Sequence, residues 1–111
     1  DKGDADDQYI LGFMYFDGKG VPQDYIQTAY WFTKAAEKGH VDAQYNLGLM
    51  HIKGQGVIKD NVEAYAWWNI AAARGNEDAA NGRDSIAEKM TPTQLEKAQE
   101  LSKVYFQKYT K

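Results

Sequence analysis

The sequence has no cysteine in its 111 residues, which excludes disulfide bonds and thiolate chemistry and leaves the redox compartment open. It also lacks an excess of basic residues, because 13 lysines and arginines stand against 16 acidic residues and the net charge is −3. Proteins bind nucleic acid through basic surfaces that release counterions from the phosphates, so this charge balance argues against nucleic acid as a partner. No apolar run approaches the roughly 18 residues of a membrane-spanning helix, so membrane insertion is not expected either.

The chain does contain enough apolar material for one small packed domain. Apolar residues make up 43% of the sequence and aromatic residues 14%, while the 26% of charged residues are of both signs. Disordered chains combine low hydrophobicity with high net charge, and this sequence has neither property.

Residues 4–39 and residues 40–75 are two copies of one pattern of 36 residues. Aligned without a gap, the two copies are identical at 14 of 36 positions. A fixed period of roughly 20 to 50 residues is typical of solenoids, in which each repeat is one supersecondary unit that stacks on the next. The repeat therefore predicts a solenoid before any helix or strand propensity is considered.

Each repeat carries the signals of two helices. Asp24 and Asp60 are placed as helix N-caps, and Gln27 and Glu63 follow three residues later, as in a capping box. Glycine pairs end the first helix of each repeat, because glycine readily adopts the left-handed conformation that follows a helix. The residues expected to define the repeat are Gly12, Gly18, Gly20, Asp24, Trp31, Gly48, Gly54, Gly56, Asp60 and Trp67.

The small residues inside these helices predict close helix packing. A glycine in a helix costs up to about 1 kcal/mol relative to alanine, so Gly12 and Gly48 imply a compensating contact. Trp31 and Trp67 are expected to fill the space between the two helices of each repeat.

The N-terminus repeats the end of a unit. Lys2-Gly3 corresponds to Lys38-Gly39 and Arg74-Gly75, which end the two repeats. Residues 1–3 are therefore expected to be the remnant of a preceding repeat, with the chain as the C-terminal piece of a longer array. The surface that such a repeat would cover is expected to promote self-association through the N-terminal edge.

Residues 76–111 are predicted to be a degenerate repeat followed by a capping helix. A helix is expected over about 77–90, after which the glycine pair of the other repeats is missing. Thr91-Pro92-Thr93-Gln94 then opens a last helix, with threonine as N-cap and proline at the first helical position. A terminal unit that departs from the repeat can close the exposed end of an array.

The order of these residues resembles the Sel1-like repeat, a relative of the tetratricopeptide repeat, over essentially the whole chain. The first repeat supplies Gln8, Leu11-Gly12, Tyr15, Gly18, Gly20, Val21, Asp24, Trp31, Ala35-Ala36 and Gly39. The second supplies Gln44, Leu47-Gly48, Gly54, Gly56, Val57, Asp60, Ala64, Trp67, Ala71-Ala72 and Gly75. Three residues depart from the family's usual alanine, alanine and tyrosine, and these are Asp7, Thr28 and His51.

The resemblance implies an all-α fold, a right-handed superhelix of antiparallel helix pairs whose first helices line the concave side. It also implies a scaffold or adaptor that binds a protein or peptide in a bacterial envelope, signalling or host-interaction system. Two alternatives remain: an enzyme acting on cell-wall or β-lactam substrates, and a spacer that holds other domains apart. The resemblance does not specify the partner, because a fold does not specify its function. It also leaves two bacterial compartments, the cytoplasm and the periplasm or exterior.

The first helix of each repeat also carries an apolar stripe opposite the family's packing residues. On a helical wheel this stripe points away from Leu11 and Leu47, so it is expected to face the concave groove and contact a partner. Tyr9 and Phe16 fit packing between repeats as well, whereas Phe13 and Leu49 point most directly outward. The stripe consists of Tyr9, Phe13, Phe16, Tyr45, Leu49 and Ile52.

No group of residues predicts catalysis, a cofactor or a metal site. His40 and His51 lie eleven residues apart without nearby ligands at zinc spacing. His40 is therefore expected at the surface near a helix start, and His51 at a packing position. Ser85 is followed by Lys89, one residue too far for the Ser-x-x-Lys pattern of β-lactam enzymes. The chain is therefore not expected to be an enzyme.

Overall fold

The computed structural model describes residues 3–109, and these form six helices and no strand. The predicted helices are confirmed, although the fifth ends three residues earlier than expected. Of the proposed remnant at residues 1–3, only Gly3 lies within the described residues. The helices are α1 (Ala5–Asp17), α2 (Tyr25–Glu37), α3 (Val41–Lys53), α4 (Asn61–Ala73), α5 (Glu77–Ala87) and α6 (Pro92–Tyr109).

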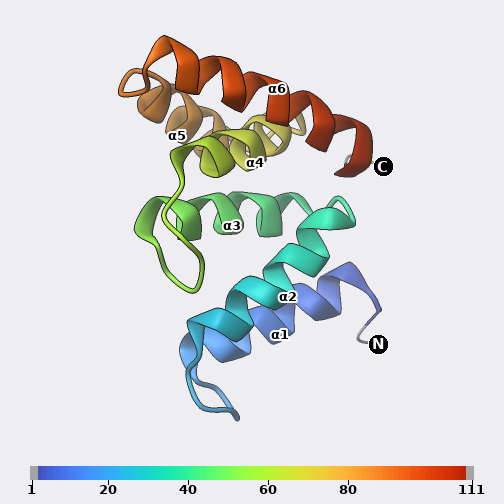
Figure 1. Ribbon diagram of the computed structural model, residues 1–111. Coiled ribbons are helices and arrows are strands. Elements are labelled where there is room, and N and C mark those ends of the chain that lie inside the picture. The colour runs from blue at the N-terminus through green and yellow to red at the C-terminus, as the bar shows by residue number, and fades with distance from the viewer. Residues whose placement is uncertain (1–2, 110–111) are drawn as a thin grey trace.

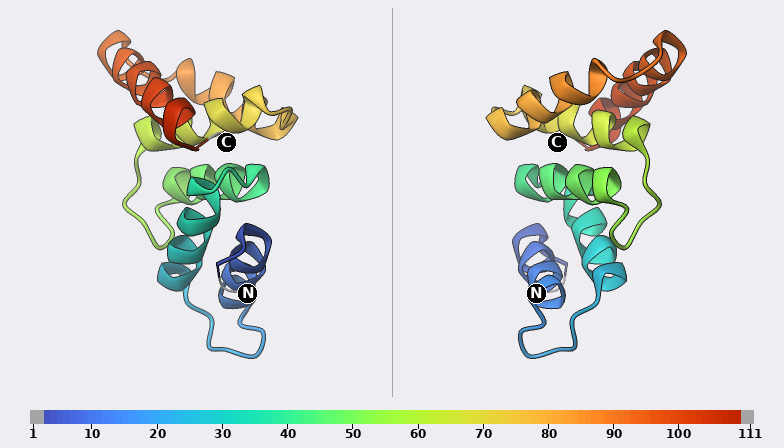
Figure 2. Two further views of the ribbon diagram at one scale, coloured as in Figure 1. Left: turned by 90° about the vertical axis from the view of Figure 1, so that its right-hand side faces the viewer. Right: turned by 90° about the vertical axis from the view of Figure 1, so that its left-hand side faces the viewer.

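The helices stack in chain order into an elongated solenoid, as Figures 1 and 2 show. Within each repeat α1 packs on α2 and α3 packs on α4, while α2–α3 and α4–α5 contacts join one unit to the next. The described residues extend over 44 × 27 × 20 Å. The predicted all-α solenoid is thus confirmed. None of its helices is both long and apolar enough to cross a bilayer within the described residues.

The N-caps of the second helices form as predicted, but only one of the expected capping boxes closes. The carboxylates of Asp24 and Asp60 each accept two backbone amide hydrogen bonds at the start of α2 and α4. The boxes at Asp24 and Asp60 do not close, because the backbone N–H of each aspartate donates to a carbonyl of the preceding helix, that of Tyr15 or of His51. The Glu63 carboxylate accepts a hydrogen bond from the Tyr105 hydroxyl. Thr91 and Gln94 do form the reciprocal pair, with side chain to backbone distances of 3.0 and 3.1 Å.

The close approach at the helix glycines is confirmed, but the residues that fill the space differ from the prediction. A Cβ added to Gly12 would lie 2.6 Å from Phe32, and one added to Gly48 would collide with the indole of Trp68. The aromatic residue that follows Trp31, and the one that follows Trp67, therefore pack between the paired helices. Trp67 is also buried, in a cluster that includes Ala43 and Leu47 of α3, and the rings of Tyr105 and Tyr109 on α6 cover it.

The last helix, α6, lies across α4 and does not form a close hairpin with α5. The rings of Tyr105 and Tyr109 pack on Trp67 at centroid distances of 4.5 and 5.3 Å. The Gln44 amide also donates to the Tyr109 carbonyl at 3.2 Å, which ties the end of α6 to α3. The final helix therefore shields the outer surface of the second repeat.

The position of α6 over α4 explains two differences in sequence between the repeats. Tyr30 and Lys34 are exposed on α2, whereas their equivalents Ala66 and Ile70 on α4 are fully buried. A tyrosine or an ammonium group would not fit beneath α6 without steric or desolvation cost. The sequence of the second repeat is therefore adapted to being covered.

Candidate functional site

All six residues of the predicted contact stripe are half-buried, and the structure divides them into two groups. All of them except Phe16 pack against clusters of buried residues, and Phe13, Phe16 and Leu49 also line one shared cavity. None of the six is among the large apolar side chains that are most exposed to solvent. Helical periodicity identifies the stripe, but neighbouring repeats cover part of it.

Tyr9 packs between the first and second repeats. Its ring stacks on Phe32 at 5.2 Å and lies 4.4 Å from the His40 ring, while its hydroxyl accepts a 2.9 Å hydrogen bond from the Asn46 amide. Burial, assisted by the nearby Asp42 carboxylate, raises the pKa of Tyr9 to about 12. Tyr9 therefore joins α1 to α3 and fits the inter-repeat packing that the sequence left open.

The second repeat uses its stripe in a similar way. Tyr45 lies 6.1 Å from Trp68 in a stacked arrangement, and the Trp68 indole N–H donates to the Tyr45 carbonyl at 2.9 Å. Ile52 packs against the cluster formed by α4, α5 and α6. Both residues are therefore held by intramolecular contacts.

The remaining three stripe residues come together across two repeats. Phe13 and Phe16 from α1 and Leu49 from α3 line a partly enclosed cavity of about 120 Å³. Phe32 and Met50, which are almost completely buried, are also part of its lining. The edge-on contact of Phe13 with Phe32, at 5.2 Å, and with Phe16, at 5.9 Å, fixes the orientation of this aromatic wall.

Polar groups complete the cavity, and the sequence did not predict their role. Asn46, Lys53 and Gln55 line it together with the apolar residues, and none of the carboxylates that the structure describes contributes to the lining. The Lys53 side chain forms no ion pair with any residue that the structure describes. On the helical wheel Asn46 and Lys53 flank the stripe, which is the signal that could have identified them.

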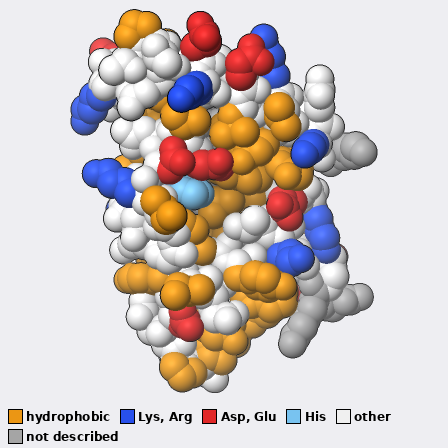
Figure 3. All heavy atoms as spheres, viewed as in Figure 1, with side chains coloured by type: hydrophobic (Ala, Val, Ile, Leu, Met, Phe, Trp, Pro, Cys, Tyr) orange, Lys and Arg blue, Asp and Glu red, His pale blue; other side chains and the backbone are white. Residues whose placement is uncertain are grey.

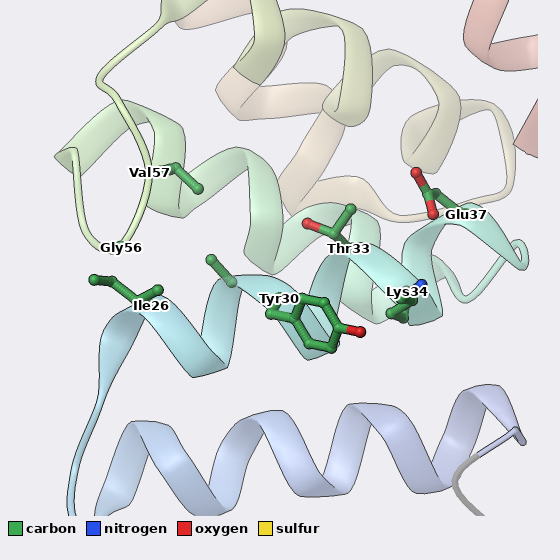
Figure 4. A pocket seen from close by; sticks show the side chains of 8 residues that line it. Ile26, Tyr30, Thr33, Lys34, Glu37, Gly56 and Val57 are labelled. Atoms are coloured by element: carbon green, nitrogen blue, oxygen red, sulfur yellow. The ribbon is translucent and has the colours of Figure 1, made fainter.

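A second hollow lies on the outer surface, between α2 and the loop before α4. It measures about 410 Å³, and Figure 4 shows Ile26 and Val57 at one end and Lys34 and Glu37 at the other. In Figure 3 apolar side chains gather over this part of the molecule, where Ile26 is 70% exposed. The hollow is wide and open, and its charges are of both signs, so it specifies no ligand.

Both histidines form hydrogen bonds with the backbone of neighbouring segments. His40 is the N-cap of α3 and not a surface residue: its Nδ1 accepts from the Ala43 amide, and its Nε2 lies 3.1 Å from the Asp6 carboxylate. His51 Nδ1 lies within hydrogen-bond distance, 3.1 Å, of the Ile58 carbonyl. In the described part of the chain no three His, Cys, Asp or Glu side chains are grouped as metal ligands.

Known structures share this arrangement. The c5321 protective antigen of uropathogenic Escherichia coli, described as having an SLR fold, matches 98% of this chain at 39% identity with a TM-score of 0.94. A Sel1 repeat protein from Oxalobacter formigenes matches 76% at 43% identity with a TM-score of 0.73. Cysteine-rich protein B of Helicobacter pylori matches 69% at 30% identity with a TM-score of 0.67.

These relatives are longer than this chain, which covers 24% of each of the first two and 58% of the third. No curated protein sequence matches it. The family model of the Sel1 repeat matches twice, at residues 5–40 and 41–76. Two matched repeats, stacked helix pairs and close structural relatives lead to one conclusion: the chain belongs to the Sel1 repeat family.

Proposed function

We propose that this chain is the binding module of a protein-interaction scaffold, with the groove between α1 and α3 as the place where a partner segment docks. The observation that carries the proposal is the shared cavity of Phe13, Phe16 and Leu49. Residues of two repeats form it together, so its shape depends on how the repeats stack. An apolar cavity with a few convergent polar groups is the usual form of a binding site.

The family supports this class of function. Sel1 repeat proteins generally serve as scaffolds for protein–protein interactions and are typically not enzymes. A solenoid presents a long shaped surface, and an extended or helical peptide is the kind of ligand that such a surface accommodates. The setting we propose is a bacterial envelope, signalling or host-interaction system, since the three relatives come from bacteria and one is a protective antigen.

Crosslinking mass spectrometry in the native cells would identify the partner and the segment that contacts this chain. We expect crosslinks from residues near the cavity, such as Lys53, to be more frequent than crosslinks from Lys34 on the outer surface. Nuclear magnetic resonance with the purified segment would then map the site without any mutation. The amides of Phe13 and Leu49 should shift on titration.

A matched pair of variants separates the groove from the outer surface. Phe13→Ala with Leu49→Asp removes part of the cavity wall, whereas Ile26→Ala with Ile58→Asp changes two exposed residues of the outer surface. Only the first pair should abolish binding of the identified segment, with helical circular dichroism retained. Binding that survives the first pair and is lost with the second would overturn the groove as the site.

A further inference from the structure

The cavity between α1 and α3 depends on the particular residues at this junction, and the repeat pattern alone does not produce it. One repeat later, Phe32 is replaced by Trp68 and Asn46 by Gly82. The Trp68 indole lies so close to Gly82 that an added Cβ would be 2.6 Å from the ring. The larger ring thus occupies, at the α3–α5 junction, space that stays open at the α1–α3 junction.

The size of the open space suits one side chain. An apolar cavity of about 150 Å³ in another protein holds a benzene molecule. A cavity of about 120 Å³ therefore accommodates a side chain between leucine and phenylalanine in size. Its floor of Phe32 and Met50, which are 2% and 3% exposed, offers such a group an apolar contact on several sides.

The charge in the cavity lining determines which kind of partner residue is favoured beside the bound apolar side chain. Lys53 provides the only charge in the lining and has no ion-pair partner among the described residues. Asn46 already donates to the Tyr9 hydroxyl and to the Asp42 carbonyl, so its amide nitrogen is engaged within the protein. An ammonium group beside an apolar cavity favours a neighbouring carboxylate and disfavours a neighbouring cation.

We infer that the cavity binds a single bulky apolar side chain of a protein partner, with an aspartate or glutamate of the same segment paired to Lys53. This inference rests on the proposed function and adds the chemistry of the partner. The 111 residues together carry a net charge of −3, which repels acidic peptides at long range. A preference for acidic segments must therefore come from the local cation.

A random dodecapeptide display library tests the inference directly. Selection on the unmodified chain should enrich peptides with one Leu, Met or Phe and an Asp or Glu within about two positions. Lys53→Gln should weaken the selected peptides about threefold and Lys53→Glu about tenfold, as expected for an ion pair at a rim. Selection on Lys53→Glu should enrich lysine or arginine in place of the acidic residue.

Two further variants make the outcomes distinct. Lys89→Glu makes the same charge change one repeat later, outside the cavity, and should leave the selected peptides unchanged. Leu49→Phe fills part of the cavity and should weaken every selected peptide at least about tenfold, with circular dichroism and the melting curve confirming the fold.

The results separate this inference from the proposed function. Peptides that depend on Leu49 but show no acidic preference and no response to Lys53→Glu would overturn the carboxylate partner and leave the groove as the site. Peptides that bind the Leu49→Phe variant as well as the original chain would overturn both. A library that yields no binding peptide would overturn the inference alone, because the crosslinking experiment tests the groove independently.

Discussion

The hydroxyl of Tyr105 donates a 2.7 Å hydrogen bond to the carboxylate of Glu63, 42 residues earlier in the chain. This bond joins the last helix to the start of α4, close to the stacked rings of Trp67 and Tyr105. The hydrogen bond therefore fixes where α6 lies on the second repeat, and removing it should lower the free energy of unfolding.

Replacing Tyr105 by phenylalanine keeps the ring and removes only the hydroxyl. We expect the free energy of unfolding to fall by about 1 kcal/mol, because a half-buried carboxylate loses its donor. Thermal or urea unfolding monitored by circular dichroism measures the change. Tyr109→Phe is the control, since its hydroxyl has no hydrogen-bond partner in the described part of the chain. If both variants lost the same free energy of unfolding, the hydrogen bond between Tyr105 and Glu63 would not contribute to stability.

Gly56 and Gly20 occupy equivalent positions and have nearly the same φ, 71° and 75°. A Cβ at Gly56 would collide with the backbone carbonyl of Tyr25, whereas one at Gly20 would meet only the end of Met14 at 3.8 Å. Alanine at Gly20 should cost about 1–2 kcal/mol, the usual strain of a left-handed residue. Alanine at Gly56 should cost clearly more, because the loop must also move away from the preceding repeat.

Chemical denaturation of the two glycine variants provides the measurement. The difference between them reports the contact between the second loop and α2. If both variants lose the same stability, the loop does not pack on the preceding repeat in solution.

Alkaline pH should destabilise the protein partly through Tyr9. In the unfolded chain a tyrosine has a pKa near 10, whereas burial and the Asp42 carboxylate raise the pKa of Tyr9 to about 12 in the folded protein. Below pH 10 the phenol is protonated in both states and the stabilisation is complete. Between about pH 10 and 12 the unfolded state releases this proton first, so the free energy of unfolding falls as the pH rises.

The Tyr9→Phe variant isolates this contribution. Its stability should decrease less steeply than that of the original chain over the same pH interval, measured by urea unfolding at each pH. Tyr30→Phe is a matched control, because Tyr30 is 51% exposed. A slope that is unchanged by Tyr9→Phe would contradict the prediction.

Self-association through α1 is expected from the equivalence of the two repeats. In α3, Ala43 and Leu47 are buried beneath α2, with 0% and 2% exposed. Their equivalents in α1 are Asp7, which is exposed, and Leu11, which is half-buried. The part of Leu11 that stays accessible is apolar surface, and such surface favours association.

Sedimentation velocity over a range of concentrations would detect the resulting dimer. Leu11→Lys should shift the equilibrium to the monomer, whereas Ile26→Lys, on the outer surface, should not. A single monomeric species at all concentrations would exclude association through this edge. If only Ile26→Lys shifted the equilibrium to the monomer, the interface would lie on α2 instead.

The difference between sequence and structure is clearest at the aromatic stripe. Helical spacing places Tyr9, Phe13 and Phe16 on one face of α1, and the structure agrees that they share it. The spacing cannot tell which of them a neighbouring helix covers, because that depends on residues far away in the chain. His40 and Asn46, from the second repeat, are what hold Tyr9 in the core.

The period, the aspartate caps of the second helices and the glycine turns, and with them the solenoid, could be predicted because these signals are local or repeat at a fixed distance. The sequence pattern did not reveal that Phe32 and Trp68 fill the space between the paired helices, that α6 lies on α4, or that a cavity remains at the first junction. Those features depend on the volumes of side chains from different helices that meet in space. The difference between a phenyl ring at Phe32 and an indole at Trp68 has no local signal, yet it decides where the molecule stays open.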